Sequence, residues 1–316
     1  MKLKRWYDQV NVEEIFENNK WAVTLDDRLI VTRNEKPLFV PTKQMALAVA
    51  SEWEDIDGLV PLAVLPLTSL LARSHDDMPK FRNYYQDEIL DFLQNDHVCF
   101  RDEDVQRDYE KQLEVHQPIV ECFTKQTGLE LGISHGCSSQ DHPKKTIDTI
   151  HLFLKTLDDF TFHLFHSTIH ATKSVATAVA LWANAITIEH AISAVSLEED
   201  LNANEHGFVE GAHDLKRAQT VVDVHCAALL LQLSGVPAPN QQTLSLLGDA
   251  TKELEKLSQN EIEREARLNA MMLQQFKQAL NSEIARDPEN KKALQFFINT
   301  LEQKQEDSQP PKPKDQ

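Results

Sequence analysis

Several residue types and motifs are scarce or missing in this chain, and each absence argues against a class of fold or function. Glycine accounts for only 8 of 316 residues, which argues against an extended β architecture because tight turns depend on glycine. The cysteines at positions 99, 122, 137 and 226 form no C-x-x-C pair, so the sequence has neither a zinc ribbon nor a redox motif. We expect four free thiols in a reducing compartment.

Motifs for nucleotide binding, nucleic-acid binding and membrane insertion are also missing. The sequence contains no P-loop, no G-x-G-x-x-G and no G-x-S-x-G, so it predicts neither a nucleotide site nor ATP hydrolysis. A formal net charge of −18 argues against nucleic acid, which needs clustered Lys and Arg, and is compatible with a partner that carries basic patches. No apolar run approaches the roughly 20 residues of a membrane span.

Hydrophobic periodicity predicts an α+β fold in which a small N-terminal β-sheet domain packs on a larger all-helical domain. Over residues 20–41, apolar side chains alternate with others around an Asp26-Asp27 turn, which is typical of strands. After Pro41 the apolar residues recur at helical spacing, with Thr42 as the expected N-cap of the first helix. Further helices are predicted at about 80–95, 105–127, 144–158, 161–184, 187–204 and 213–234.

A proline-containing segment, Ser234–Pro239, predicts a domain boundary because proline disfavours helix continuation. Beyond it, polar helices are expected over 242–278 and 288–303. The predicted parts are a β domain (1–41), a helical domain (42–235), a helical extension (236–307) and a disordered tail (308–316). We expect the extension to bury little surface; the alternative is an apolar stripe that docks back, made of Leu244, Leu247, Leu254 and Leu257.

The most informative segment is a cluster of acidic residues near position 200. Its members are Glu198, Glu199, Asp200, Glu210 and Asp214. Acids near a helix C-terminus oppose the helix dipole, so we expect the first three to have cationic partners, either in another molecule or at Lys173 or Arg217 in this chain. The alternatives are a solvated helix end for these three and an N-cap role for Asp214.

Short sequence blocks spread over residues 5–235 indicate a resemblance to a known protein family. They are Arg5-Trp6-Tyr7, Leu25–Arg28, Pro37–Pro41, Leu47–Trp53, Pro66–Leu70, Asp96–Arg101, Lys173-Ser174, Leu197-Glu198-Glu199 and Glu210–Asp214. In this order and spacing they resemble the F1 complex assembly factor 2 family, the mitochondrial and alphaproteobacterial assembly chaperones for the α subunit of F1 ATP synthase. His206-Gly207 departs from the family's Trp-Gly, and His116-Gln117-Pro118 from its Trp-Asp-Pro.

The resemblance implies an ATP-independent chaperone that binds the free α subunit and masks the surface that α later gives to β. It also implies the mitochondrial matrix, with the presequence absent from or removed in this chain. No catalytic residue, cofactor or metal is expected, and we expect a monomer. Partner binding is assigned to the acidic cluster, and structural roles are expected for Trp53, Arg28 and Lys173.

Two other functions remain as alternatives. His163, His166 and His170 lie on one face of a predicted helix, where imidazoles on successive turns can share a metal ion. That arrangement would suit a metal-dependent hydrolase, although the sequence supplies no further ligand at a recognisable spacing; packed histidines are the plainer interpretation. The second alternative is a generic helical scaffold in which residues 237–316 dock another protein.

Overall fold

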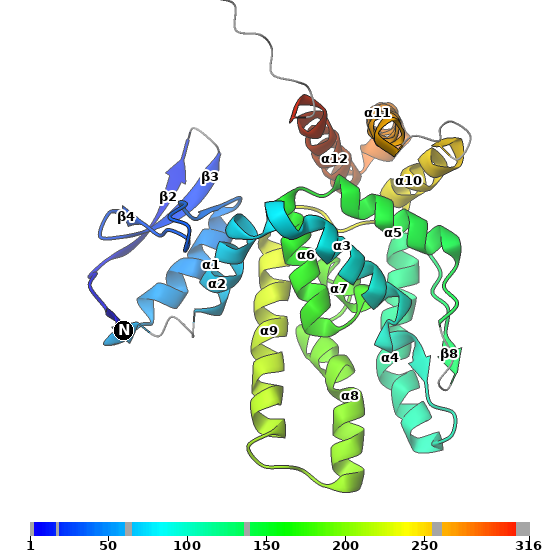
Figure 1. Ribbon diagram of the computed structural model, residues 1–316, viewed down its shortest axis with the longest axis horizontal. Coiled ribbons are helices and arrows are strands. Elements are labelled where there is room, and N and C mark those ends of the chain that lie inside the picture. Colours follow the sequence, from blue (N-terminus) through cyan, green and yellow to red (C-terminus); the bar gives the residue numbers. More distant parts are fainter. Residues whose placement is uncertain (1–2, 17–18, 61–64, 136–139, 255–260, 308–316) are drawn as a thin grey trace, which may run out of the picture.

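The computed structural model describes residues 3–16, 19–60, 65–135, 140–254 and 261–307. The predicted disordered tail, Cys137 and Leu257 lie outside these ranges. Figure 1 shows a small sheet at one side of a larger group of helices, with the C-terminal helices above that group. The predicted α+β fold is confirmed.

The N-terminal sheet contains four antiparallel strands that cover one side of the first helix. They are β2 (Val10–Ile15), β3 (Lys20–Leu25), β4 (Arg28–Leu29) and β5 (Phe39–Val40). β3 is central and pairs with the other three strands. Asp26 and Asp27, both at positive φ, form the two-residue turn from β3 to β4, as hairpin geometry requires. The sequence analysis missed β2, whose Val10 and Val12 lie opposite Leu25 and Val23.

Nine helices in the described residues follow the sheet and build the main body. They are α1 (Lys43–Glu54), α2 (Pro66–Asp76), α3 (Met78–Gln94), α4 (Gln106–Thr127), α5 (Lys144–Thr156), α6 (Asp159–Thr172), α7 (Val175–Trp182), α8 (Ile188–His206) and α9 (His213–Leu233). Thr42 N-caps α1 by accepting the Met45 N–H at 3.2 Å, as predicted. In the described part of the chain, no helix has both the length and the apolar character that a membrane span requires.

Two predictions for this body need correction. The helix expected over 161–184 is two helices, because Lys173 adopts a left-handed conformation with φ of 56° and Ser174 then N-caps α7. The buried Asp96 carboxylate also accepts the Ala176 N–H at 3.1 Å, which fixes the start of α7. The part expected to be all helical also contains short strands, which are β6 (Leu59–Val60), β7 (Phe100–Arg101) and β8 (Ser134–His135).

These short strands brace the loops between helices. β6 pairs antiparallel with β1 (Leu3–Lys4), which ties the start of the described chain to the segment after α1. β7 and β8 pair in parallel, and β7 follows a short 3-10 helix, η2 (His97–Cys99). Two-residue strands have no room for a periodic sequence pattern, which explains why periodicity did not predict them.

The C-terminal extension packs onto the main body. It contains α10 (Gln241–Leu254), α11 (Glu261–Leu280), a 3-10 helix η3 (Glu283–Arg286) and α12 (Pro288–Asp307). α10 lies against α4 and α5, and α12 lies against α5. Leu244 and Leu247 are fully buried and share one hydrophobic core with the sheet and the main body. The expectation that the extension buries little surface is therefore wrong, and these two leucines dock as in the alternative.

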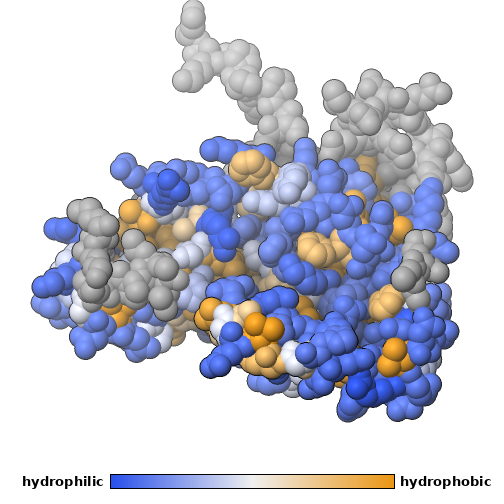
Figure 2. All heavy atoms as spheres, turned by 60° about the horizontal axis from the view of Figure 1, so that its bottom comes forward, coloured by the Kyte–Doolittle hydropathy of each residue, from blue (hydrophilic) through white to orange (hydrophobic). Residues whose placement is uncertain are grey.

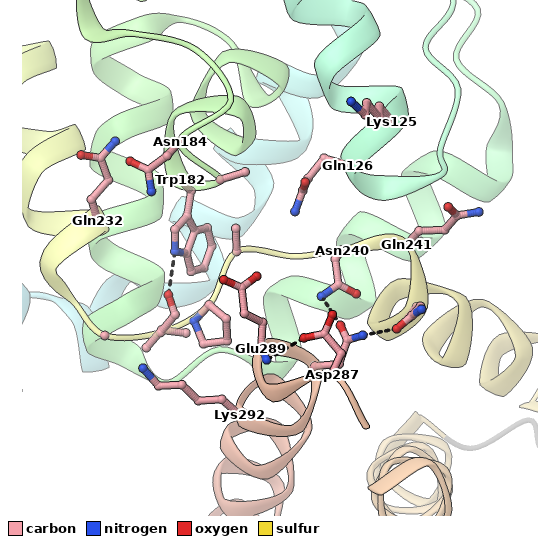
Figure 3. A pocket seen from close by; sticks show the side chains of 17 residues that line it. Lys125, Gln126, Trp182, Asn184, Gln232, Asn240, Gln241, Asp287, Glu289 and Lys292 are labelled. Carbon is pink, nitrogen blue, oxygen red and sulfur yellow. Dashed lines mark hydrogen bonds between the residues drawn. The ribbon is translucent and has the colours of Figure 1, made fainter. Parts of the chain in front are cut away.

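The linker into the extension is held by side chains around a pocket of about 570 Å³. Figure 3 shows Trp182 pointing at the linker, where its indole N–H donates to the Val236 carbonyl at 3.0 Å. Gln126 donates to the Pro239 carbonyl at 3.1 Å, and Asn240 donates to Asn290 at 2.9 Å. The polar side chains of this pocket thus join the linker to α4, α7 and α12.

Candidate functional site

Helices α8 and α9 form an antiparallel hairpin whose outer half projects beyond the core. The last buried residue on α8 is Leu197, the first on α9 is Val224, and none of the residues from 198 to 223 is buried. We call residues 198–223 the distal arm. In Figure 1 the distal arm extends below the other helices. All five acidic residues singled out from the sequence lie on it.

The sequence of α8 explains why this helix runs so far out. Thr187 N-caps it by accepting the His190 N–H at 3.2 Å, as predicted, and Glu189 places a favourable negative charge in the first turn. The helix continues to His206 and ends at Gly207, whose φ of 95° suits glycine. Glu198, Glu199 and Asp200 therefore lie well before the helix end, where the dipole effect has fallen off.

Two of these three acids have cationic partners on the facing helix. Lys216 Nζ lies 2.8 Å from Glu199 Oε2, and Arg217 Nη1 lies 2.8 Å from Asp200 Oδ1. Of the options considered from the sequence, Arg217 is a partner within this chain. Lys173 takes no part, because its ammonium lies 5.7 Å from the centre of the Phe92 ring. Glu198 is exposed and forms no ion pair or hydrogen bond with any residue that the structure describes.

The second acidic group lies at the turn and the start of α9. Glu210 is exposed in the turn. Asp214 is not the N-cap: α9 begins at His213, after Ala212, which has no side chain able to cap a helix. Asp214 instead lies in the first turn, where it suits the helix dipole, and its Oδ2 accepts the Gly211 N–H at 3.4 Å. The turn and the start of α9 thus carry one exposed carboxylate each.

The distal arm also carries large apolar side chains that the sequence analysis did not select. Phe208, Val209 and Leu215 are 59%, 57% and 70% exposed. Viewed from the arm end, Figure 2 shows orange side chains gathered among blue ones. The signal was present in the sequence, since a Phe-Val pair stands between two glycines in an acidic segment. Periodicity finds apolar residues that face a core, so it passes over residues of this kind.

The histidine face of α6 is part of the packing between α6 and α3. His163 and His166 are buried, whereas His170 is exposed. His166 Nε2 lies 2.7 Å from Glu88 Oε2, and its ring lies against that of Tyr85. Burial lowers the pKa of His163 to about 3. Among the described residues, no group of three His, Cys, Asp or Glu side chains is placed to hold a metal ion.

Another buried histidine lies where α4 meets α8. His116 is fully buried, and its Nε2 lies 3.3 Å from the Ala194 carbonyl on α8. Its ring meets that of His97 edge to face, with centroids 5.4 Å apart. Burial, reinforced by the nearby His97, lowers the pKa of His116 to about 3. The imidazole therefore stays neutral and helps to seat the buried half of α8.

The three residues expected to be structural occupy different environments. Trp53 is 5% exposed, at the junction of the N-terminal segment with α1 and α2. Lys173 is the left-handed residue between α6 and α7, and its carbonyl lies 3.0 Å from His97 Nδ1. Arg28 lies opposite Leu25 in the β3–β4 hairpin, and its side chain is exposed.

This chain is similar to a family model, to a curated protein and to solved structures. Residues 4–124 match the family model described as ATP12 chaperone protein. The mitochondrial protein atp12 of Schizosaccharomyces pombe is 24% identical over 218 residues, which cover 65% of this chain and 75% of that protein.

Solved structures share the fold. Atp12 from Paracoccus denitrificans superposes with a TM-score of 0.66 at 20% identity, over 73% of this chain and 98% of that one. The Atu1473 protein from Agrobacterium tumefaciens gives a TM-score of 0.65 at 24% identity, over 73% of this chain and 85% of that one. The family match over residues 4–124 and the relative that is similar over 65% of this chain point the same way: the chain is similar to the ATP12 chaperone protein family.

Proposed function

We propose that this chain is an ATP-independent assembly chaperone of ATP synthase that binds the free α subunit of the F1 sector and masks the surface that α later gives to β. The match of residues 4–124 to the ATP12 chaperone protein family supports the general activity. The choice of α as client comes from the resemblance of the acidic blocks on the distal arm to the family pattern. Glu198, Glu199, Asp200, Glu210 and Asp214 are proposed to lie in the contact surface.

One observation carries this proposal: the distal arm, in which no residue is buried, carries a carboxylate that is unpaired among the described residues. Glu198 has no partner among the described residues, whereas the adjacent Glu199 and Asp200 are held by Lys216 and Arg217. An acid that contributes nothing to the fold, next to acids fixed in place, is available to a basic group on another protein. Complementary charges of this kind steer encounter and fix the register of a complex.

An exposed, acidic surface of this kind suits the task of an assembly chaperone. A free α subunit exposes the interface that it later buries, and exposed apolar surface of that size aggregates unless it is covered. The chaperone must also leave when β arrives. A contact with a large charged component allows exchange, because exposed ion pairs each contribute only about 0.2–1 kcal/mol.

The same proposal places the protein in the mitochondrial matrix. The Schizosaccharomyces pombe relative is described as mitochondrial, and the assembly of F1 from its subunits would take place on the matrix side.

The direct test is capture of purified, separately refolded F1 subunits by the full chain, without nucleotide. We expect the chain to retain α, to retain β much less, and to release α when β is added. Light scattering of α alone and with the chain then reports whether binding prevents aggregation. Failure to retain α, or equal retention of α and β, would overturn the choice of client.

A further inference from the structure

The end of the distal arm presents an apolar surface that no part of the chain covers in the described structure. Phe208, Val209 and Leu215 are among the most exposed large apolar side chains of the described residues. Phe208 and Val209 lie in the turn between α8 and α9, and Leu215 lies in the first turn of α9. We call these three residues the arm tip. Contiguous apolar side chains rimmed by polar ones are typical of a protein contact surface.

Folding of this chain does not require these side chains. The hairpin is anchored by its inner half, where Leu197 and Val224 reach the core, whereas every residue of the distal arm stays at least partly exposed. A solvent-exposed turn between two helices could equally be made of polar residues. The side chains of the arm tip therefore expose apolar surface to solvent and contribute nothing to the core. Its three side chains are therefore available for a contact outside the chain.

Three ion pairs and one aromatic contact connect the parts of the distal arm to one another and to α4. The pairs Lys216–Glu199 and Arg217–Asp200 connect α9 to α8. A third pair connects α8 to the neighbouring α4, where Arg107 Nη2 lies 3.5 Å from Glu205 Oε2. Within the turn, the Phe208 ring meets the His213 ring edge to face with centroids 5.1 Å apart. A preformed surface loses less entropy on binding than a loop that must be ordered.

The charges around the arm tip define what fits against it. The distal arm contains seven acidic and two basic side chains, and both basic ones are already paired with Glu199 and Asp200. Glu198, Glu210 and Asp214 have no cationic partner among the described residues. A bound segment must therefore bring apolar side chains for the arm tip and positive charges for the three acids.

We infer that the arm tip is a docking surface for a client segment in which apolar side chains stand next to Lys or Arg. The inference rests on the proposed function, in that the client is the α subunit, and it adds the chemical class of the segment that is recognised. Phe208, Val209 and Leu215 bury the apolar part of that segment, and Glu198, Glu210 and Asp214 receive its cations. The apolar contact supplies most of the affinity, and the acids supply orientation.

Two other occupants are disfavoured by the same charges. A second copy of this chain would place one acidic distal arm against another, which costs free energy because like charges repel. An anionic lipid surface repels an acidic arm, whereas membrane-binding surfaces carry clusters of Lys and Arg. A basic, apolar protein segment remains as the occupant.

The test compares two double variants of the full chain. Phe208→Ser with Leu215→Ser removes most of the arm tip. Phe16→Ser with Leu47→Ser is the matched control, because it removes one exposed Phe and one exposed Leu, 87% and 50% exposed, from the N-terminal part. Binding to immobilised α is measured at low and high salt, alongside thermal unfolding and sedimentation. We expect the arm-tip variant to raise Kd about tenfold or more with an unchanged melting temperature, and the control to bind as the parent does.

Further readouts separate the inference from the proposed function. Binding of the parent should weaken as salt rises, and among overlapping peptides of α those that bind should combine apolar residues with Lys or Arg. If the parent binds α and the arm-tip variant binds it equally well, the inference fails while the proposed function stands. If the parent does not bind α at all, the proposed function itself fails. Equal binding of acidic peptides, or a parent dimer that the arm-tip variant abolishes, would overturn the assigned occupant.

Discussion

Trp53 donates its indole N–H to the hydroxyl of Thr68 at 3.0 Å, and so connects the end of α1 to the first turn of α2. The same hydroxyl donates to the Glu52 carboxylate at 2.8 Å, and that carboxylate also accepts the N–H groups of Leu67 and Thr68. The start of α2, whose flanking Leu65 provides no side-chain cap, is thereby capped from another helix. From the other side, the Tyr7 hydroxyl donates to the Trp53 carbonyl at 2.6 Å.

Replacing Trp53 by arginine should therefore destabilise the fold. The change removes a buried ring that meets Trp6 and Tyr7 edge to face, breaks the bond to Thr68 and buries a charge. We expect a loss of roughly 3–5 kcal/mol in the free energy of unfolding, measured by denaturant titration. Trp53→Phe keeps most of the apolar volume and should lose much less. An unchanged melting temperature for Trp53→Arg would show that the junction does not depend on this ring.

Glu198→Lys should weaken binding to α while leaving the fold intact. The side chain is exposed and unpaired within the described residues, so we expect a change of about 0.5 kcal/mol or less in stability. Reversal of its charge should slow association with α, measured at low salt. Glu14→Lys provides the control, since it makes the same charge change at an exposed position on β2. Equal effects of the two variants on binding would point to net charge rather than to a role for Glu198.

Truncation after Gly235 should leave an unstable protein. The cut removes Leu244, Leu247 and Phe297 from the shared core, and burial of three such side chains contributes on the order of 5 kcal/mol. That is comparable with the whole net stability of a domain. We expect residues 1–235 to be insoluble or to melt far below the full chain. A truncated protein that melts as the full chain does would show that the extension is a separate module.

A single substitution in the full chain examines the same interface. Phe297 on α12 meets the Phe153 ring of α5 edge to face with centroids 6.2 Å apart. Phe297→Ala should cost roughly 3–5 kcal/mol in a chemical unfolding experiment. Gln295→Ala, at an exposed position on the same helix, should leave the midpoint almost unchanged.

Acid should destabilise the protein through His116 and His163. The pKa of each is lowered to about 3 in the folded chain, mainly by burial, against about 6.5 when unfolded. Between these values the unfolded chain binds protons that the folded chain does not. The free energy of unfolding should therefore fall as pH falls below about 6.5, by up to roughly 1.4 kcal/mol per pH unit for each histidine.

The contribution of one histidine can be isolated by substitution. His163→Asn removes a titrating group from the α6 face, so the dependence of unfolding free energy on pH should become shallower than that of the parent. Denaturant titrations at a series of pH values measure both slopes. Identical slopes for the two proteins would mean that His163 takes up its proton without unfolding.

Local sequence chemistry determined much of the fold. Thr42 and Thr187 could be identified as N-caps because each bonds an N–H only three residues away. The Asp26-Asp27 turn and the helical period after Pro41 depend on neighbours in the same way. The acidic cluster was also visible, because charge is a property of the residue itself.

Other features were decided by contacts between distant segments, which no local pattern reports. Lys173 ends α6 in a left-handed conformation that its residue type does not favour, while Asp96, far away in sequence, fixes the start of α7. The leucines of α10 were recognised as a possible stripe, but only their burial against α4 and α5 decided that the extension joins the core.

In the distal arm, too, some features follow from the sequence and others from the tertiary structure. The sequence by itself placed acids near position 200, whereas Lys216 and Arg217 reach Glu199 and Asp200 only because α8 and α9 run antiparallel. That geometry leaves Glu198 without a partner among the described residues and places Phe208, Val209 and Leu215 beyond the reach of the core. Residue type fixes which charges and apolar groups exist. Only tertiary packing decides which of them are neutralised or buried, because both depend on neighbours that the chain brings together by folding.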